Sequence, residues 1–195
     1  MSRRNLILIG ACVAGLFILA GLAWRAGVFE APPSAGPGGP FQLVDQTGKP
    51  VTEAVLKGKW SAVFFGFTYC PDVCPTTLAA MAQAQERLGP KADKLQVVFV
   101  SLDPERDTPA QMAAYLANDA FPKGTVGLTG TPEQVAVAAK AYRVFYEKSG
   151  TGPDYLINHS TASYLMDPKG RFARVLPYGI SPDEIARQIS DAMAK

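Results

Sequence analysis

The sequence has little histidine, little cysteine and no run of basic residues. One histidine and three cysteines occur among its 195 residues, and the formal net charge is only +2. Nucleic-acid binding requires a concentrated basic surface, which this charge pattern does not supply. We therefore expect no nucleic-acid partner. The shortage of cysteine also directs attention to Cys70 and Cys74, the only two outside the first two dozen residues.

Charge is also absent from residues 6–24, LILIGACVAGLFILAGLAW. This is about the length that crosses the hydrocarbon core of a bilayer as a helix. Arg3 and Arg4 precede the segment and only Arg25 follows it closely, so the positive-inside rule keeps residues 1–5 in the cytoplasm and exports the remainder. The sequence predicts one N-terminal transmembrane helix.

Two other interpretations of this segment remain open. A cleaved signal peptide usually has an apolar region of only about 7–15 residues, which is shorter than this one. Small residues precede Cys12 in the stretch IGAC, as they do at lipid-modified cysteines, but the apolar run continues beyond it. We favour the uncleaved anchor and regard Cys12 as a small apolar residue in the membrane.

A change in composition then separates a linker, residues 25–40, from a globular domain, residues 41–195. Residues 31–40 read APPSAGPGGP and contain only Pro, Gly, Ala and Ser. Such a segment cannot bury a core and is typical of an extended, mobile spacer. We expect it to tether the domain to the membrane.

Continuous apolar runs within the domain indicate buried strands. The clearest are WSAVFFGF at 60–67 and LQVVFVSL at 95–102, and uninterrupted apolar strands are usually buried on both faces of a sheet. Between them, the segment from Thr76 to Leu88 has apolar residues at helical spacing. Strand, helix and strand therefore form one βαβ unit with parallel strands.

Capping and turn signals complete the fold. Three helices are predicted to begin at Thr108, Thr131 and Ser181, each of which is followed by proline and, two residues later, by Glu or Gln. Antiparallel hairpins are predicted near residues 41–51 and over 163–176, where Asp-Pro-Lys-Gly suits a type I turn. Together these elements predict an α/β, thioredoxin-like fold with a mixed central sheet flanked by helices.

The two cysteines follow the first long strand. Cys70 falls in the loop after the strand, and Cys74 falls at the start of the next helix. Because Pro75 suits the first helical position, we expect Cys74 at or beside the N-cap. There the positive end of the helix dipole favours the thiolate, so we predict a pKa for Cys74 below that of a free cysteine. The thiolate is both a nucleophile and a metal ligand.

The pair has three interpretations: a structural disulfide, a redox pair or part of a metal site. A disulfide across three intervening residues closes a short loop and stabilises a domain only weakly, so we favour a functional pair. His159 is the only histidine. It is a weak signal by itself, because a lone histidine is more often a surface or hydrogen-bonded residue than a ligand.

Two thiolates and one imidazole suit Cu(I), which prefers sulfur over oxygen ligands. Zinc accepts the same groups, but structural zinc sites usually have four protein ligands. A carboxylate such as Asp72 or Asp103 is available as a fourth ligand. The residues therefore favour copper and leave zinc as a weaker alternative.

The sequence resembles the Sco/SenC family of copper-binding assembly proteins for cytochrome c oxidase. The resemblance includes FGFTYCPDVCPTTL around the cysteines, VSLDPERDTP at 100–109 and HSTASYLMDPKG at 159–170, together with the anchor and spacer. It implies a thioredoxin fold in which Cys70, Cys74 and His159 bind one copper, as Cu(I) or also as Cu(II).

The resemblance also gives Asp103 a candidate role. It corresponds to an acidic residue that the family keeps near the copper, behind the direct ligands. The alternative for Asp103 is a turn or cap residue before a helix.

The resemblance further implies a role and a location. The family's proposed task is to deliver copper to the dinuclear copper centre on the periplasmic subunit of the oxidase, or to reduce the cysteines of that centre. The implied partners are the copper-centre subunit of cytochrome c oxidase and periplasmic copper donors or thiol reductants. The implied protein is a metallochaperone of the bacterial inner membrane, with its soluble domain in the periplasm, and not an enzyme with a small-molecule substrate.

Two other functions share some of these features. A periplasmic thiol–disulfide oxidoreductase or redox sensor would use Cys70 and Cys74, but the usual motif has two residues between its cysteines, and INHST lacks the proline that often faces the disulfide. A peroxiredoxin is suggested by VCPTT. That family has Thr or Ser three residues before the nucleophile, where this chain has Pro71.

Overall fold

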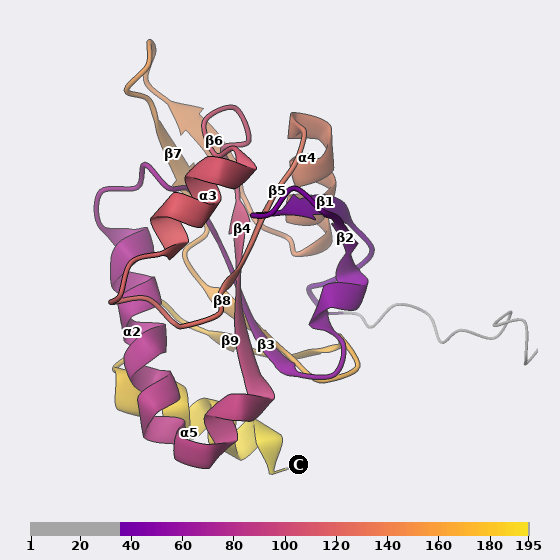
Figure 1. Cartoon of the computed structure of the whole chain (residues 1–195), viewed down its shortest axis with the longest axis vertical. Helices are drawn as coiled ribbons and strands as arrows, with labels where there is room; N and C mark the ends of the chain where they lie inside the picture. The colour runs from indigo at the N-terminus through magenta and orange to yellow at the C-terminus, as the bar shows by residue number, and fades with distance from the viewer. Residues whose placement is uncertain (1–35, 195) are drawn as a thin grey trace, which may run out of the picture. The chain divides into compact units, whose positions relative to one another are not determined.

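The computed structural model describes residues 36–194. Their centre is a seven-stranded sheet with the order β2-β1-β5-β4-β3-β8-β9 (Figure 1). Its strands are β1 Gln42–Asp45, β2 Pro50–Thr52, β3 Trp60–Gly66, β4 Leu95–Ser101, β5 Val126–Thr129, β8 Ser163–Met166 and β9 Phe172–Leu176. The helices are α2 Val73–Leu88, α3 Pro109–Leu116, α4 Pro132–Ala141 and α5 Pro182–Met193, with short 3-10 helices η1 Glu53–Leu56 and η2 Gly89–Lys94.

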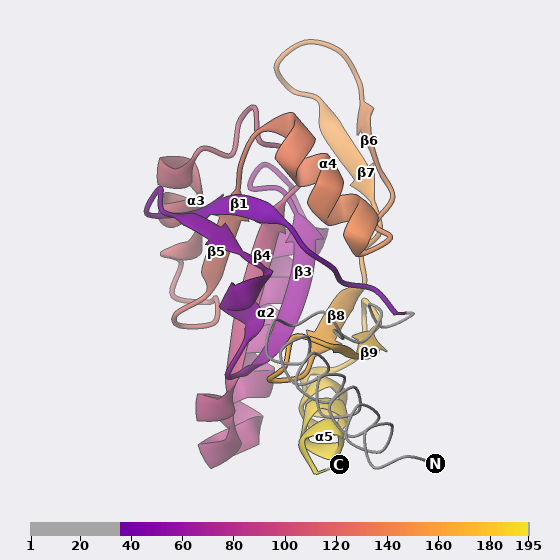
Figure 2. The same cartoon turned by 90° about the vertical axis from the view of Figure 1, so that its right-hand side faces the viewer.

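Helices cover both faces of the sheet. In Figures 1 and 2, α2, α3 and α5 lie on one side of it and α4 lies on the other. Alternate side chains of the strands contact the two layers. Phe64 and Phe99 pack together and Phe99 contacts Tyr115 of α3, whereas Phe65 packs on Tyr142 at the end of α4.

The predicted thioredoxin-like arrangement is confirmed. Strands β3 and β4 are parallel, almost wholly buried and joined through α2. Strand β8 pairs antiparallel with β3, and the two predicted hairpins are β1–β2 and β8–β9. The sheet is therefore mixed, with its parallel part at the centre.

The predicted helix starts at Thr108, Thr131 and Ser181 are also confirmed. Each hydroxyl accepts a hydrogen bond from the backbone N–H three residues later. At Thr131 the side chain of Gln134 also accepts from the backbone N–H of the N-cap, which completes a capping box.

The start of α2 differs from the prediction. Asp72 is the N-cap and Val73 the first helical residue, so Cys74 lies inside the first turn and Pro75 is the third helical residue. A proline is tolerated there because the first four backbone N–H groups of a helix have no intrahelical partner. The expectation that Pro75 opens the helix was therefore wrong by two residues.

A second, two-stranded sheet was not predicted. It is the hairpin of β6, Tyr146–Ser149, and β7, Leu156–His159, which stands beside α4 in Figure 2. Strand β6 reads YEKS and three of its four residues are exposed, so it lacks the apolar pattern by which strands are recognised. Gly150 and Gly152 adopt positive φ in its connecting loop.

The buried core of the described residues lies wholly between Phe41 and Ile189, and residues 36–194 belong to one compact unit. Within the predicted linker, the backbone N–H of Gly38 donates to the carbonyl of Ala141 at 2.9 Å. The predicted anchor over residues 6–24 and the segment before it lie outside the described residues. Among residues 36–194, no helix has the length and apolar character that crossing a membrane requires.

Candidate metal and thiol site

The three predicted ligands come together beyond the end of β3. Cys70 lies in the loop after this strand, Cys74 lies in the first turn of α2, and His159 is the last residue of β7. The Sγ of Cys74 is 3.9 Å from Nε2 of His159, and the backbone N–H of Cys74 donates to Sγ of Cys70 at 3.4 Å. Residues separated by 85 positions in the sequence are thus neighbours.

The His159 ring is oriented as a ligand would be. Its Nδ1 lies 2.8 Å from the carbonyl oxygen of Ser160, and because a carbonyl can only accept, Nδ1 carries the proton. The lone pair of the neutral ring is then on Nε2, which faces Cys74. The rings of Phe64 and Phe67 pack edge-on against the imidazole, with ring centroids 6.4 and 6.1 Å from that of the imidazole. A hydrogen bond on the far nitrogen is the usual way in which proteins hold a metal-binding histidine.

The separation of sulfur and nitrogen also fits a shared metal ion. With bond lengths of about 2.3 Å to sulfur and about 2.1 Å to nitrogen, as in zinc sites, the two ligand atoms are about 3.8 Å apart at a trigonal angle. The observed separation is 3.9 Å. Within residues 36–194, however, no three His, Cys, Asp or Glu side chains are already gathered as a metal site.

The two cysteines are both free thiols, but their surroundings differ. Cys74 is completely buried, whereas Cys70 is partly exposed. The hydrogen bond from the side chain of Cys74 is the main cause that lowers the pKa of Cys70 to about 4. The backbone N–H of Cys74 contributes less, and burial opposes both effects. The same side-chain hydrogen bond, together with burial, raises the pKa of Cys74 well above its ordinary value.

This result contradicts the predicted low pKa of Cys74. The stabilising N–H group at the start of α2 points to Cys70 instead, because the Cys70 sulfur accepts the backbone N–H of Cys74. The burial of Cys74, which opposes ionisation, comes from tertiary packing that local sequence does not reveal. The exposed thiolate is therefore Cys70.

The last residue of β3 has to be small for this arrangement. A Cβ atom on Gly66 would lie 2.6 Å from the Sγ of Cys74 and 2.9 Å from the ring of Phe99. The sulfur of Cys74 thus occupies the space that a side chain at position 66 would fill.

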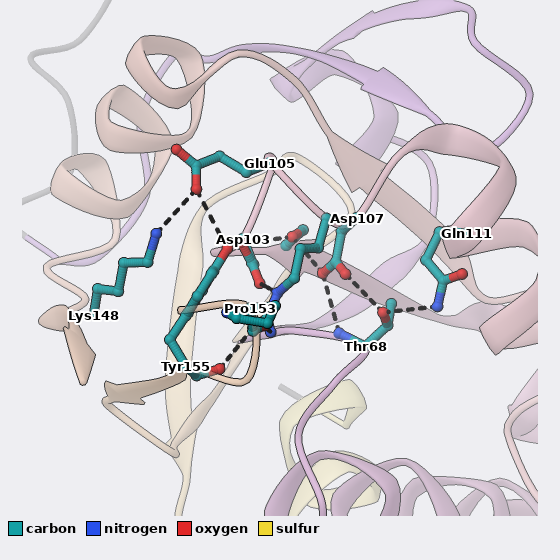
Figure 3. A network of polar contacts seen from close by, with 10 residues as sticks. Thr68, Asp103, Glu105, Asp107, Gln111, Lys148, Pro153 and Tyr155 are labelled. Atoms are coloured by element: carbon teal, nitrogen blue, oxygen red, sulfur yellow. Dashed lines mark hydrogen bonds and ion pairs between the residues drawn. The ribbon is translucent and has the colours of Figure 1, made fainter. Parts of the chain in front are cut away.

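Asp103 anchors a polar network beside the site (Figure 3). Its side chain is buried, and its two carboxylate oxygens accept hydrogen bonds from Nε of Arg106 and from the phenol of Tyr155. Its backbone carbonyl accepts from the N–H groups of Arg106 and Asp107 in a turn. The carboxylate is thus bound by these partners and not by the cysteines or His159.

Asp107 is a structural residue of the site that the sequence interpretation missed. Its buried carboxylate accepts from the backbone N–H and the hydroxyl of Thr68 and from the hydroxyl of Ser101. Burial nevertheless raises its pKa. Thr68 precedes Cys70 by two residues, so Asp107 fixes the cysteine loop to the end of β4. The only sequence signal was an aspartate four residues after Asp103.

Comparisons with known proteins place the chain among related sequences. The sequence description of the SCO1/SenC family matches residues 30–194. Protein SenC of Rhodobacter capsulatus is 41% identical over 168 residues, which cover 86% of this chain and 74% of that protein. The mitochondrial Protein SCO1 homolog 1 of Arabidopsis thaliana is 44% identical over 156 residues, 77% of this chain but only 46% of that protein. The chain thus spans less than half of the Arabidopsis protein.

Solved structures are similar over the same region. ScoI of Bradyrhizobium japonicum, solved with copper bound, has a TM-score of 0.73 and 44% identity, over 80% of this chain and 99% of that one. BsSco, in which a disulfide switch was identified, has a TM-score of 0.66 and 27% identity over 83% of this chain and 94% of that one. The matched region makes up nearly the whole of both solved chains.

Proposed function

This chain belongs to the SCO1/SenC family, and on that premise we propose that it is a membrane-anchored copper carrier. It binds one copper ion through Cys70, Cys74 and His159 and serves the assembly of the dinuclear copper centre of cytochrome c oxidase. The copper-bound ScoI of Bradyrhizobium japonicum and the description of BsSco as a member of a family of cytochrome c oxidase assembly proteins support this proposal.

The observation that carries the proposal is the orientation of His159. Its Nε2, which carries the lone pair when the ring is neutral, lies 3.9 Å from the sulfur of Cys74, while Nδ1–H donates to a backbone carbonyl. This orientation leaves Nε2 available to a metal ion bound by the two sulfur atoms. Soft thiolates with one imidazole form a donor set that suits Cu(I) and that also accepts Cu(II).

The exposure of the two cysteines suits a carrier. Cys74 and His159 hold copper from the inner side, and the partly exposed Cys70 offers a sulfur to which an incoming ligand of the recipient has access. Copper binding displaces the proton of Cys74, so binding is linked to pH. Oxidation of the two thiols to a disulfide removes both sulfur ligands, so the redox state controls loading.

The location follows from the N-terminal segment. Residues 6–24 form a single transmembrane anchor, residues 1–5 stay in the cytoplasm, and residues 25–40 tether the domain on the periplasmic side of the bacterial inner membrane. The support is the uncharged length of the segment and the position of Arg3 and Arg4 before it. A fusion of alkaline phosphatase to the C-terminus should be active, and activity of a cytoplasmic reporter at that position would contradict this orientation.

An anaerobic Cu(I) competition titration tests the copper site. We expect the reduced domain, residues 34–195, to bind one copper tightly, His159→Ala to bind it at least about tenfold more weakly, and the Cys70→Ala/Cys74→Ala double variant to lose competitive binding. Each variant is first checked by circular dichroism. Unchanged affinity in His159→Ala would contradict the three-ligand site.

The cysteine geometry also favours a second candidate, a thiol–disulfide switch. The Cys70 thiolate can attack a partner disulfide to form a mixed disulfide, which releases one partner thiolate. Cys74, once deprotonated, then attacks the sulfur of Cys70, which breaks the bond between Cys70 and the partner and releases the second partner thiolate. The partner thereby gains two electrons, and this chain gains a Cys70–Cys74 disulfide. A disulfide switch is described for BsSco. Reduction of a disulfide in the copper-centre subunit, lost in Cys70→Ser, would support this activity, and turnover by Cys70→Ser would exclude it.

A further inference from the structure

The hairpin that carries His159 is attached to the domain in an unusual way. Within residues 36–194, β6 and β7 pair only with each other and are not hydrogen bonded into the seven-stranded sheet. The position of His159 relative to the cysteines therefore depends on contacts other than a sheet ladder. One contact of this kind lies at the start of β7.

Arg106 makes that contact. Its Nη1 donates to the carbonyl of Pro153 at 3.0 Å, and its Nη2 donates to the carbonyl of Tyr155 at 2.9 Å. Tyr155 immediately precedes β7, whose last residue is His159. One guanidinium group thus holds two backbone carbonyls of the loop between β6 and β7, next to the first residue of the strand that ends at His159.

The same guanidinium is fixed on the body of the domain. Its Nε forms a salt bridge with the buried carboxylate of Asp103, and the carbon of the group lies 3.6 Å from the ring centroid of Tyr155. It also lies 4.5 Å from the ring of Tyr69, the residue directly before Cys70. Arg106 therefore touches the hairpin, the loop after β4 and the cysteine loop at once.

We propose that Arg106 is a positioning residue that sets the place of His159 relative to Cys70 and Cys74, with the buried Asp103 as its fixed support. This inference rests on the proposed copper site and adds to it a residue that does not touch the metal. Tyr155 strengthens the link, because its phenol donates to the second oxygen of Asp103. The carboxylate of Asp103 thus acts on His159 through Arg106 and Tyr155.

Lysine cannot replace arginine in this role. The guanidinium offers donors in a rigid, planar fork, and here three separate nitrogens bind Asp103, Pro153 and Tyr155. A lysine ammonium would keep the charge beside Asp103 but cannot span both carbonyls in the same geometry. Arg106→Lys therefore loosens the hairpin without leaving the buried carboxylate unpaired.

A double-mutant cycle with His159 tests the proposal. Cu(I) affinity is measured by anaerobic competition for the domain, residues 34–195, for Arg106→Lys, for His159→Ala and for the double variant. We expect Arg106→Lys to weaken Cu(I) binding about tenfold when His159 is present, which is at the lower end of the losses seen when residues that support metal ligands are changed. When His159 is alanine, Arg106→Lys should have no further effect. Arg171→Lys is the matched control, because Arg171 pairs with Asp167 in the remote β8–β9 turn.

Amide hydrogen exchange supplies a readout that does not involve copper. Residues 146–159 of metal-free Arg106→Lys should exchange faster than in the unaltered domain, while the exchange of β3 and β4 remains the same. Tyr155→Phe, which removes only the phenol contact with Asp103, should give a smaller loss of affinity that also requires His159.

The outcomes separate the two proposals. Equal weakening by Arg106→Lys with and without His159, or no weakening when His159 is present, would overturn the role of Arg106 and leave the copper site intact. Unchanged affinity in His159→Ala alone would overturn the copper site itself, and the role of Arg106 with it.

Discussion

The reactivity of Cys70 toward iodoacetamide should be almost independent of pH in the reduced, metal-free domain. With a pKa of about 4, about 99% of Cys70 is thiolate at pH 6, and almost all of it is at pH 9. A free cysteine with a pKa of about 8.5 passes from about 0.3% to about 75% thiolate over the same range. Its alkylation rate therefore rises about 240-fold, whereas the rate of Cys70 stays nearly constant.

The absolute rate is less informative than this pH profile. A thiolate becomes less nucleophilic as its pKa falls, and a fall of about 4.5 pKa units reduces its intrinsic rate about 100-fold. At pH 6 the larger thiolate fraction of Cys70 offsets this loss, so its net rate exceeds that of a free cysteine only about threefold. The weak pH dependence of the Cys70 alkylation rate is therefore the result to test.

Mass spectrometry of peptides from the alkylated domain measures each cysteine separately. Cys74 should remain unmodified in the folded protein because it is completely buried. Cys74→Ala removes the side-chain hydrogen bond that contributes most to the low pKa of Cys70, so the Cys70 profile of that variant should shift toward that of a free cysteine. A Cys70 rate in the unaltered domain that rises in step with a free cysteine between pH 6 and pH 9 would refute this reasoning.

Three further results are expected. Asp107→Ala should lower the free energy of unfolding, measured in urea, by about 2–4 kcal/mol. The reason is that buried donors, including the backbone N–H of Thr68, lose their charged acceptor. A change below about 0.5 kcal/mol would contradict this. Gly66→Ala should cost about 1–3 kcal/mol by the same assay, because the new methyl group overlaps the sulfur of Cys74, and an unchanged midpoint would show that the site relaxes freely. Loading with one equivalent of Cu(I) should protect Cys70 from alkylation and a chelator should restore its reactivity; equal rates with and without copper would exclude Cys70 as a ligand.

The central strands were predictable because their signal is local. The runs at 60–67 and 95–102 are apolar at nearly every position, and the strands they form are buried on both faces. The helix starts at Thr108 and Thr131 were predictable for a similar reason, since a cap requires a hydroxyl and residues within one turn of it.

The features that were missed depend on contacts between distant residues. The raised pKa of Cys74 follows from its hydrogen bond with Cys70 and from burial, and the burial comes from packing that no short segment encodes. The role of Arg106 has no signal within LDPERDTP, because its partners Pro153 and Tyr155 lie 47 and 49 residues away. The family resemblance named the three ligand candidates, but only the structure gives the protonated nitrogen of His159 and the direction in which the other one points.

X-ray absorption at the copper edge identifies the sulfur and nitrogen ligands of the bound metal. The domain, residues 34–195, is loaded anaerobically with one equivalent of Cu(I), and the same measurement is made on His159→Ala. We predict two sulfur atoms and one imidazole nitrogen around the copper, with the imidazole scattering lost in the variant. Copper bound by sulfur alone in the unaltered domain, with a spectrum that His159→Ala does not change, would contradict this prediction.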